Sequence, residues 1–242
     1  MQLKKNAKNL SIGVYKVVYY NMKVIFAGKF IYFVVAALSI YAFLLGIYLM
    51  NPDTYLSEAN VFWLLFIPGV LIVFYPTAFG IQNDFDYRML EIIFGIPNYR
   101  YKVPLVRLLL IILITFVFLI CVGEFTAVAL TKIPVHTMVF QVIVPVLFFG
   151  CLNFALSTII RDGNGTAVVV LILGILLWIG REMFQSAPSL DVFLNPFNMP
   201  QNANETAWQL TVGNNRLYLS AGSVVAILLG LLNLQKREKF LR

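Results

Sequence analysis

The feature that most constrains this chain is a run of 21 consecutive residues, Phe30 to Met50, that contains no charged side chain. Such a run is long enough to cross the hydrocarbon core of a bilayer as a helix. Further apolar stretches follow it, and the 242-residue chain is 60% hydrophobic and only 12% charged, compared with about 25% charged residues in soluble domains. The composition excludes a soluble globular protein and a disordered one, so we predict an all-α integral membrane protein with one membrane domain.

Prolines, amides and charged residues divide the sequence into six predicted membrane spans. Pro104 is expected in the first turn of the third span, where its missing N–H is not needed, whereas Pro68 and Pro76 are expected to kink the second span. Pro145 lies inside the fourth span, which is long enough to tilt. Because six is an even number, both termini are predicted on the same side of the membrane. The predicted spans are about 30–50, 61–81, 104–129, 135–160, 166–184 and 217–234, with an external helical segment over 185–216.

Lysine and arginine are distributed unequally between the two sides that this topology defines. Lys132, Arg181 and Arg216 fall on one side, and the other 15 of the 18 fall on the opposite side. Because basic residues accumulate in cytoplasmic loops, both termini are predicted in the cytoplasm. Topology and anionic lipid account for the net charge of +7, so no nucleic-acid partner is implied. The predicted cytoplasmic set is Lys4, Lys5, Lys8, Lys16, Lys23, Lys29, Arg88, Arg100, Lys102, Arg107, Arg161, Lys236, Arg237, Lys239 and Arg242.

Residues 10–29 mix apolar side chains with lysines at 16, 23 and 29. Their apolar residues recur at steps of three and four, which is typical of an amphipathic helix that lies in the cytoplasmic interface. The alternative is a solvated basic segment that only follows the positive-inside rule. The residues with this spacing are Val14, Val17, Val18, Met22 and Ile25.

A second cytoplasmic helix is predicted over 83–97, between the second and third spans. Asn83 and Asp84 are suited to cap its start, and Gly95 with Pro97 is suited to end it. A capped amphipathic helix is longer than a simple connection requires. It either lies on lipid or docks into a groove of a partner protein, and the composition does not choose between them. Its apolar face consists of Met89, Leu90, Ile92, Ile93 and Phe94, beside Asp86, Arg88 and Glu91.

The residues that catalysis or metal binding would need are scarce. His136 is the single histidine, the sequence contains no G-x-x-x-x-G-K-[ST] phosphate loop and no G-x-S-x-G elbow, and the polar residues inside the spans are few. We therefore predict no catalytic residue, no metal site and no resident cofactor. Glu124 is expected near the headgroups, and Asn153 and Ser157 are interpreted as hydrogen-bonding between helices.

Three local motifs accompany this layout. The first is NDFDYRMLEIIFGIP from Asn83 to Pro97, followed by Arg100 and Arg107; the second is LNFALS from Leu152 to Ser157, leading to Arg161; the third is LNPF from Leu194 to Phe197. Together with the layout of the whole chain, these motifs resemble the membrane subunits of the ABC type-2 permeases, a group of mostly bacterial exporters.

The resemblance implies a multi-pass permease of the bacterial cytoplasmic membrane that forms a homodimer or heterodimer and binds two copies of a separate ABC ATPase, which would hold ATP and Mg. In that family the helix between the second and third spans is the coupling helix. The residues implied to contact the ATPase are Asp84, Asp86, Arg88, Leu90, Glu91, Ile93 and Phe94. The residues implied to line a translocation path at the dimer seam are Phe74, Tyr75 and Thr77.

Two alternatives to an ABC permease stay open at this stage. A self-contained secondary carrier or channel would show inverted repeats with paired broken helices, and only the fifth span is unusually short. An intramembrane enzyme acting on lipid would need converging acid, base or metal groups, and only His136 and Glu124 are placed to approach one another. Dependence on a partner ATPase distinguishes the permease from both, whereas the transported substance cannot be predicted from aliphatic spans.

Overall fold

The computed structural model describes residues 19, 22, 29–50, 56–86, 99–184, 187–201 and 203–235. These residues form helices and loops, with no strand among them. The helices are α2 (Phe30–Met50), α3 (Glu58–Asp86), α5 (Tyr99–Ala129), α6 (Val135–Ile160), α7 (Gly163–Ile179) and α8 (Glu205–Leu234), with two short 3₁₀ helices, η1 (Gly180–Phe184) and η2 (Pro188–Leu190).

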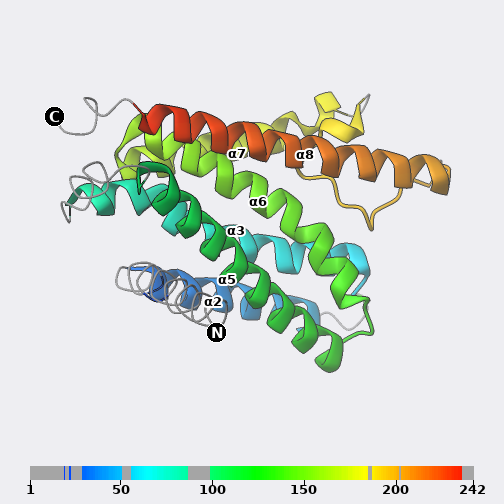
Figure 1. The fold of residues 1–242 in the computed structure, drawn as a ribbon. Coiled ribbons are helices and arrows are strands. Elements are labelled where there is room, and N and C mark those ends of the chain that lie inside the picture. Colours follow the sequence, from blue (N-terminus) through cyan, green and yellow to red (C-terminus); the bar gives the residue numbers. More distant parts are fainter. Residues whose placement is uncertain are drawn as a thin grey trace, which may run out of the picture.

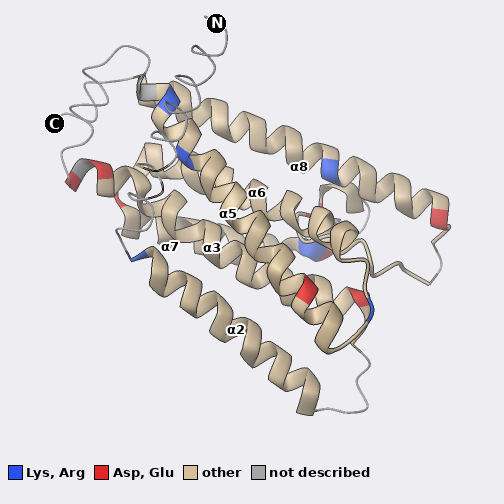
Figure 2. Cartoon of the chain, turned by 60° about the horizontal axis from the view of Figure 1, so that its bottom comes forward, with Lys and Arg blue, Asp and Glu red and all other residues tan. Residues whose placement is uncertain are grey.

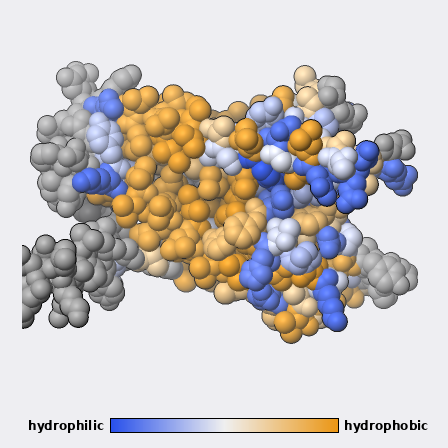
Figure 3. All heavy atoms as spheres, turned by 45° about the vertical axis from the view of Figure 1, so that its right-hand side comes forward, coloured by the Kyte–Doolittle hydropathy of each residue, from blue (hydrophilic) through white to orange (hydrophobic). Residues whose placement is uncertain are grey.

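Six helices in the described part of the chain are long and apolar enough to cross a membrane. The charged residues gather towards the two ends of the bundle and leave long uncharged helix surfaces between them (Figure 2). Viewed from the side, the molecule accordingly shows an apolar band next to a polar end (Figure 3). The predicted fold class, an all-helical multi-pass membrane protein, is confirmed at this level.

Helices α3 and α6 form the centre of the bundle (Figure 1). They pack against one another, α2 packs on α3, α8 packs on α6, and both α5 and α7 contact the central pair. The most buried of the six helices is α3, whereas α2 and α7 expose most of their apolar surface. This arrangement places the side chains of α2, α5, α7 and α8 on the outside, where lipid replaces water as the solvent.

The helices alternate in direction, so the bundle has two distinct ends (Figure 1). We call the end where α3 finishes at Asp86 and α5 starts at Tyr99 the base; α2 begins and α8 ends at this same end, on the left of Figure 1. The opposite end carries residues 187–201, which we call the cap. Of the predicted interfacial helix 10–29, only Tyr19 and Met22, which are helical, and Lys29, in a turn, lie inside the described residues.

Two of the six predicted spans, 30–50 and 135–160, have the observed bounds of α2 and α6. Helices α3 and α5 are longer than the predicted second and third spans, because their helical hydrogen bonds continue beyond the apolar cores to Asp86 and back to Tyr99. Pro104 therefore lies inside α5 rather than in its first turn.

The fifth and sixth spans also differ from the prediction. Helix α7 begins at Gly163, where the Asp162 side chain accepts a hydrogen bond from the N–H of Gly165 at 2.5 Å, and at Gly180 it gives way to the 3₁₀ helix η1. Helix α8 begins at Glu205 with Asn204 as its N-cap. Residues 205–216, the last part of the predicted external segment 185–216, thus belong to the same helix as the predicted sixth span.

Glycines allow the helices around α6 to approach closely. A Cβ atom at Gly150 would overlap the Val73 side chain of α3, and one at Gly230 of α8 would lie 2.6 Å from the Phe154 ring of α6. Membrane helices usually have glycine or another small residue at points where their backbones approach closely. The two glycines therefore fix how closely α3 and α8 pack on α6.

Candidate functional site

The described part of the predicted coupling helix belongs to α3. Asn83 and Asp84 were predicted to begin a new helix. They lie instead in the last turns of α3, which continues to Asp86. Asp86 is exposed at the base. The remaining residues assigned to ATPase coupling, namely Arg88, Leu90, Glu91, Ile93 and Phe94, lie outside the described residues.

Asp84 forms a buried ion pair with Arg107 across the base. The Arg107 Nη1 atom donates to Asp84 Oδ2 at 2.7 Å, and the two side chains are 9% and 4% exposed. In this chain the Asp84 carboxylate is thus occupied by Arg107, and its contact with an ATPase stays a prediction. The pair joins the end of α3 to the start of α5, which are the two helices on either side of residues 87–98.

A second contact ties the same end of α3 to α7. The Gln82 side chain accepts a hydrogen bond from the backbone N–H of Gly163 at 2.6 Å. A Cβ atom at position 163 would overlap the Phe79 ring, so this close approach requires glycine. Through Gln82 and Asp84 the last turns of α3 are thus bound to two other helices.

A polar contact at the middle of the bundle joins α6 to the kinked part of α3. Asn153 Nδ2 donates to the Phe74 carbonyl at 2.9 Å and to Thr77 Oγ1 at 2.8 Å, next to Pro76, which lacks an N–H. This confirms the interpretation of Asn153 as a helix-to-helix hydrogen bond. The same interpretation is wrong for Ser157, whose hydroxyl donates to the Phe154 carbonyl of its own helix.

The residues assigned to a translocation path do not share one free surface. Tyr75 is buried between the rings of Phe33 and Phe79, and Thr77 is buried against α6. Phe74 is half-buried, and its carbonyl is bound by Asn153. Both Tyr75 and Thr77 are thus packed inside this chain, and their place at a seam with a second permease stays a prediction.

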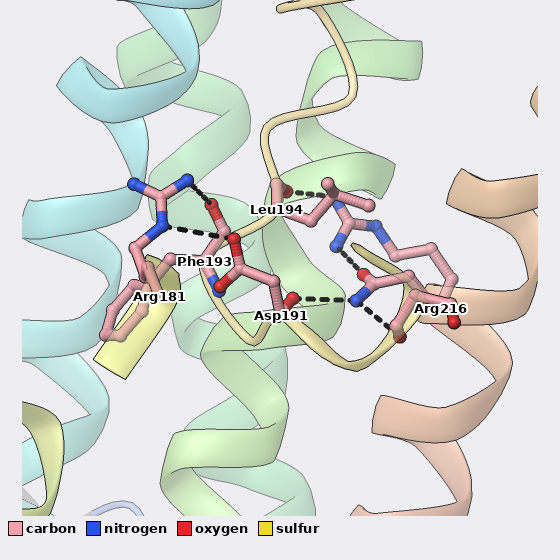
Figure 4. Close-up of polar contacts among 7 residues, drawn as sticks. Arg181, Asp191, Phe193, Leu194 and Arg216 are labelled. Atoms are coloured by element: carbon pink, nitrogen blue, oxygen red, sulfur yellow. Dashed lines mark hydrogen bonds and ion pairs between the residues drawn. The ribbon is translucent and has the colours of Figure 1, made fainter. Parts of the chain in front are cut away.

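The cap is held to the bundle by an ion pair from Arg181 of η1, the 3₁₀ helix that follows α7. Arg181 Nε donates to Asp191 Oδ2 at 3.0 Å, and Asp191 Oδ1 accepts from the N–H of Phe193 at 2.9 Å (Figure 4). The Arg181 guanidinium also lies over the rings of Trp63 and Trp178, at 5.8 and 5.1 Å from their centroids. Charge pairing and cation–π contact therefore act on the same arginine.

A second arginine fixes the cap from the other side. Arg216 of α8 donates to Gln141 Oε1, to Asn215 Oδ1 and to the Leu194 carbonyl, at 2.9, 2.7 and 3.2 Å. Asn215 is fully buried and donates to the Ser189 and Asp191 carbonyls (Figure 4). In the part of the chain that the structure describes, all the acceptors of Arg216 are neutral.

The structure brings together no catalytic set among the residues it describes. Glu124 and His136 are both exposed, and no ion pair between them occurs in this part of the chain. The described residues contain no group of three or more His, Cys, Asp or Glu side chains that is able to hold a metal ion. The polar contacts described above join one helix to another at the base and hold the cap to the helices.

Comparison with known proteins identified no relative of this chain: no family model, no curated protein and no solved structure matches it significantly.

The contacts that sequence reasoning missed are pairings between helices. The pairings of Asp84 with Arg107, of Arg181 with Asp191 and of Gln141 with Arg216 were not predicted. A signal was available, because a charged residue next to a long apolar run is expected to have a partner. Which partner it takes depends on the packing of the helices.

Proposed function

We propose that this chain is the membrane-spanning permease subunit of an ABC exporter in a bacterial cytoplasmic membrane. In this proposal two permease chains, identical or different, form the transport unit and each binds one ABC ATPase at its base. ATP and Mg belong to the ATPase subunits, so the permease itself carries out no hydrolysis. The proposal accounts for six apolar helices without a phosphate loop in the chain.

The observation that carries the proposal is the set of polar contacts that joins three helices at the base. Residues 87–98 connect α3 to α5 in the sequence, and the ion pair between Asp84 and Arg107 joins these two helices. The contact from Gln82 to Gly163 adds α7. A force applied to residues 87–98 would therefore act on three membrane helices together, which is what coupling to a moving partner requires.

The roles within the coupling segment follow from the chemistry of its residues. Leu90, Ile93 and Phe94 would fill an apolar groove of the ATPase. Asp86, Arg88 and Glu91 would set the register through charges at the rim, where electrostatic complementarity chiefly gives specificity. Asp84, being buried and paired, would position the segment instead of contacting the partner.

ATP would drive transport by changing the relative stability of two permease conformations. Closure of the ATPase pair moves the two docked segments, and differential nucleotide binding shifts the population from an inward-facing to an outward-facing dimer. Helix α3 would transmit this movement, because its last turns are bonded to α5 through Arg107 and to α7 through Gly163.

The proposal is tested by purifying the tagged protein from its native membranes in mild detergent and identifying what accompanies it. We expect an ABC ATPase in a stoichiometric amount, with ATP hydrolysis in the purified complex. Recovery of the chain without an ATPase, together with solute transport or lipid modification by the reconstituted chain alone, would replace the proposal with the carrier or the enzyme.

The docking surface is tested by the double variant Leu90→Asp/Ile93→Asp. It should insert into the membrane normally and lose most of the copurifying ATPase, because charged side chains do not enter an apolar groove. Met199→Asp is the matched control, since it also places an acid at an exposed apolar position, in the cap at the opposite end. ATPase recovery that is equal in the two variants would remove residues 87–98 from the docking surface.

A further inference from the structure

A cavity of about 630 Å³ opens beside the cap, between the end of α7 and the first turns of α8. Its wall includes Trp178, Arg181, Glu182, Asp191 and Trp208. Its volume falls within the range of about 300–1,000 Å³ that is usual for small-molecule sites. Neither the coupling proposal nor the polar contacts of the bundle give this cavity a function.

The charged groups of the cavity wall leave one negative charge uncompensated. Asp191 uses both carboxylate oxygens within the protein, one for Arg181 and one for the N–H of Phe193. Glu182 is exposed, and no described residue forms a hydrogen bond or an ion pair with it. Since the charge of Arg181 is balanced by Asp191, the wall favours a positively charged group next to Glu182.

Two tryptophans make the wall suitable for the same kind of group. Trp208 is held in place because its Nε1 atom donates to the Pro196 carbonyl at 2.8 Å. Trp178 is 49% exposed and its ring already carries the Arg181 guanidinium, so it forms part of the wall, and the cation–π contact with an added ammonium group falls to Trp208. Tryptophan is the side chain that attracts cations most strongly through its ring face, and recognition of ammonium groups is a frequent use of this attraction.

The rim of the cavity is apolar and continues into the outer surface of α7. Ile179 lines the cavity and is 69% exposed, and Met183 beside it is 82% exposed. Ile175 and Leu176 extend this exposed surface along α7. A ligand with its polar end in the cavity therefore has a place for an alkyl chain along the helix, which a sugar or a free ion would not use.

We propose that this cavity binds the ammonium headgroup of an amphiphile, with Glu182 as the counter-charge, Trp178 and Trp208 as the wall and the outer face of α7 as the path of the alkyl chain. The ammonium group comes either from a zwitterionic phospholipid of the bilayer or from a free cationic amphiphile. An anionic phospholipid is disfavoured because its headgroup would face Glu182 without an added cation. The proposal does not depend on the proposed transport function.

The test measures binding to the full-length protein in a polyoxyethylene detergent through the fluorescence of its tryptophans. The probes are dioctanoyl phosphatidylethanolamine, dioctanoyl phosphatidylglycerol, which has the same tails but no amine, and decyltrimethylammonium. We expect at least one ammonium probe to bind more tightly than phosphatidylglycerol. Glu182→Gln should raise the Kd of that probe about three- to fivefold, the effect of losing a partly exposed ion pair.

Glu124→Gln is the matched control, because it removes an exposed carboxylate of α5 that does not line the cavity. Preference for phosphatidylethanolamine identifies the bilayer as the source of the ligand, and binding of decyltrimethylammonium alone identifies a free amphiphile. Either result, with the loss in Glu182→Gln, supports the proposal. It is overturned if phosphatidylglycerol binds as tightly as the better ammonium probe, or if Glu182→Gln binds that probe as well as Glu124→Gln does.

Discussion

Asp84 and Arg107 show how two charged residues persist in a chain with so few of them. Each lies at the edge of an apolar span, and each is almost completely removed from solvent in the folded protein. The desolvation of a single buried charge costs several kcal/mol, whereas a direct pair recovers much of that cost. The burial of each charge is therefore stabilised mainly by the other member of the pair.

Arg107→Leu should destabilise the protein by about 3–5 kcal/mol, because it leaves the Asp84 carboxylate buried without its partner. The measurement is the fraction of protein that stays monodisperse in detergent after heating over a series of temperatures. We expect a clear decrease in the temperature at which half of the protein is lost.

Two variants separate the loss of the pair from the loss of a positive charge. Lys102→Gln removes an exposed charge from the same helix and should leave the thermal stability nearly unchanged. Asp84→Leu/Arg107→Met replaces both members with apolar residues and should be more stable than Arg107→Leu. If Arg107→Leu and Lys102→Gln melt at the same temperature, the ion pair does not stabilise the fold.

Among the helices, the contact between α3 and α6 determines the architecture, because these two elements form the centre on which the others pack. Gly150 of α6 lies directly against Val73 of α3. Valine is stiff at χ1, so its side chain has little freedom to move away from an added methyl group. The packing of the two central helices is thus sensitive to the size of one residue.

Gly150→Ala should destabilise the protein by about 1–3 kcal/mol, which is the usual cost of inserting a methyl group into a packed contact. Gly174→Ala of α7 is the matched control, because a Cβ atom there has no neighbour within 4 Å. The control should equal or slightly exceed the natural protein in thermal stability, since alanine favours a helix over glycine. A Gly150→Ala protein as stable as the control would contradict the close approach.

The whole molecule has two ends of different character. The base is where α3, α5 and α7 are tied together, and the cap is held by Arg181, Asn215 and Arg216 (Figures 1 and 4). Lys102 lies near the base, and residue 201 lies in the cap at the opposite end. If the helices cross the membrane, these two positions are therefore on opposite sides of it, whichever end faces the cytoplasm.

Cysteine labelling in intact cells tests this topology and its orientation. In a chain that carries Cys121→Ser and Cys151→Ala, an impermeant thiol reagent should label Asn202→Cys from outside and should label Lys102→Cys only after the membrane is opened. The expectation rests on the excess of basic residues at the base. The opposite pattern would invert the orientation, and labelling of both positions from outside would refute six crossings.

Local composition was enough to predict where α2 and α6 lie. Phe30–Met50 and Val135–Ile160 are apolar stretches with clear boundaries, because Asn51 and Pro52 follow the first and Pro134 precedes the second. The start of α8 was missed because residues 205–216 are polar, and hydropathy marks where a helix enters lipid rather than where its backbone hydrogen bonds begin. The extension of α3 to Asp86 was missed for the same reason.

The sequence by itself determined that this is a multi-pass helical membrane protein and about where each span lies. A span is a continuous run of apolar residues, so the free energy of its transfer into lipid can be judged without knowing which other segments it contacts. Only the tertiary structure decided which polar groups meet. Asp84 and Arg107 are 23 residues apart, and Gln141 and Arg216 are 75 apart. Their pairing depends on how helices pack, and that packing depends on small residues such as Gly150 whose significance appears only when two helices touch.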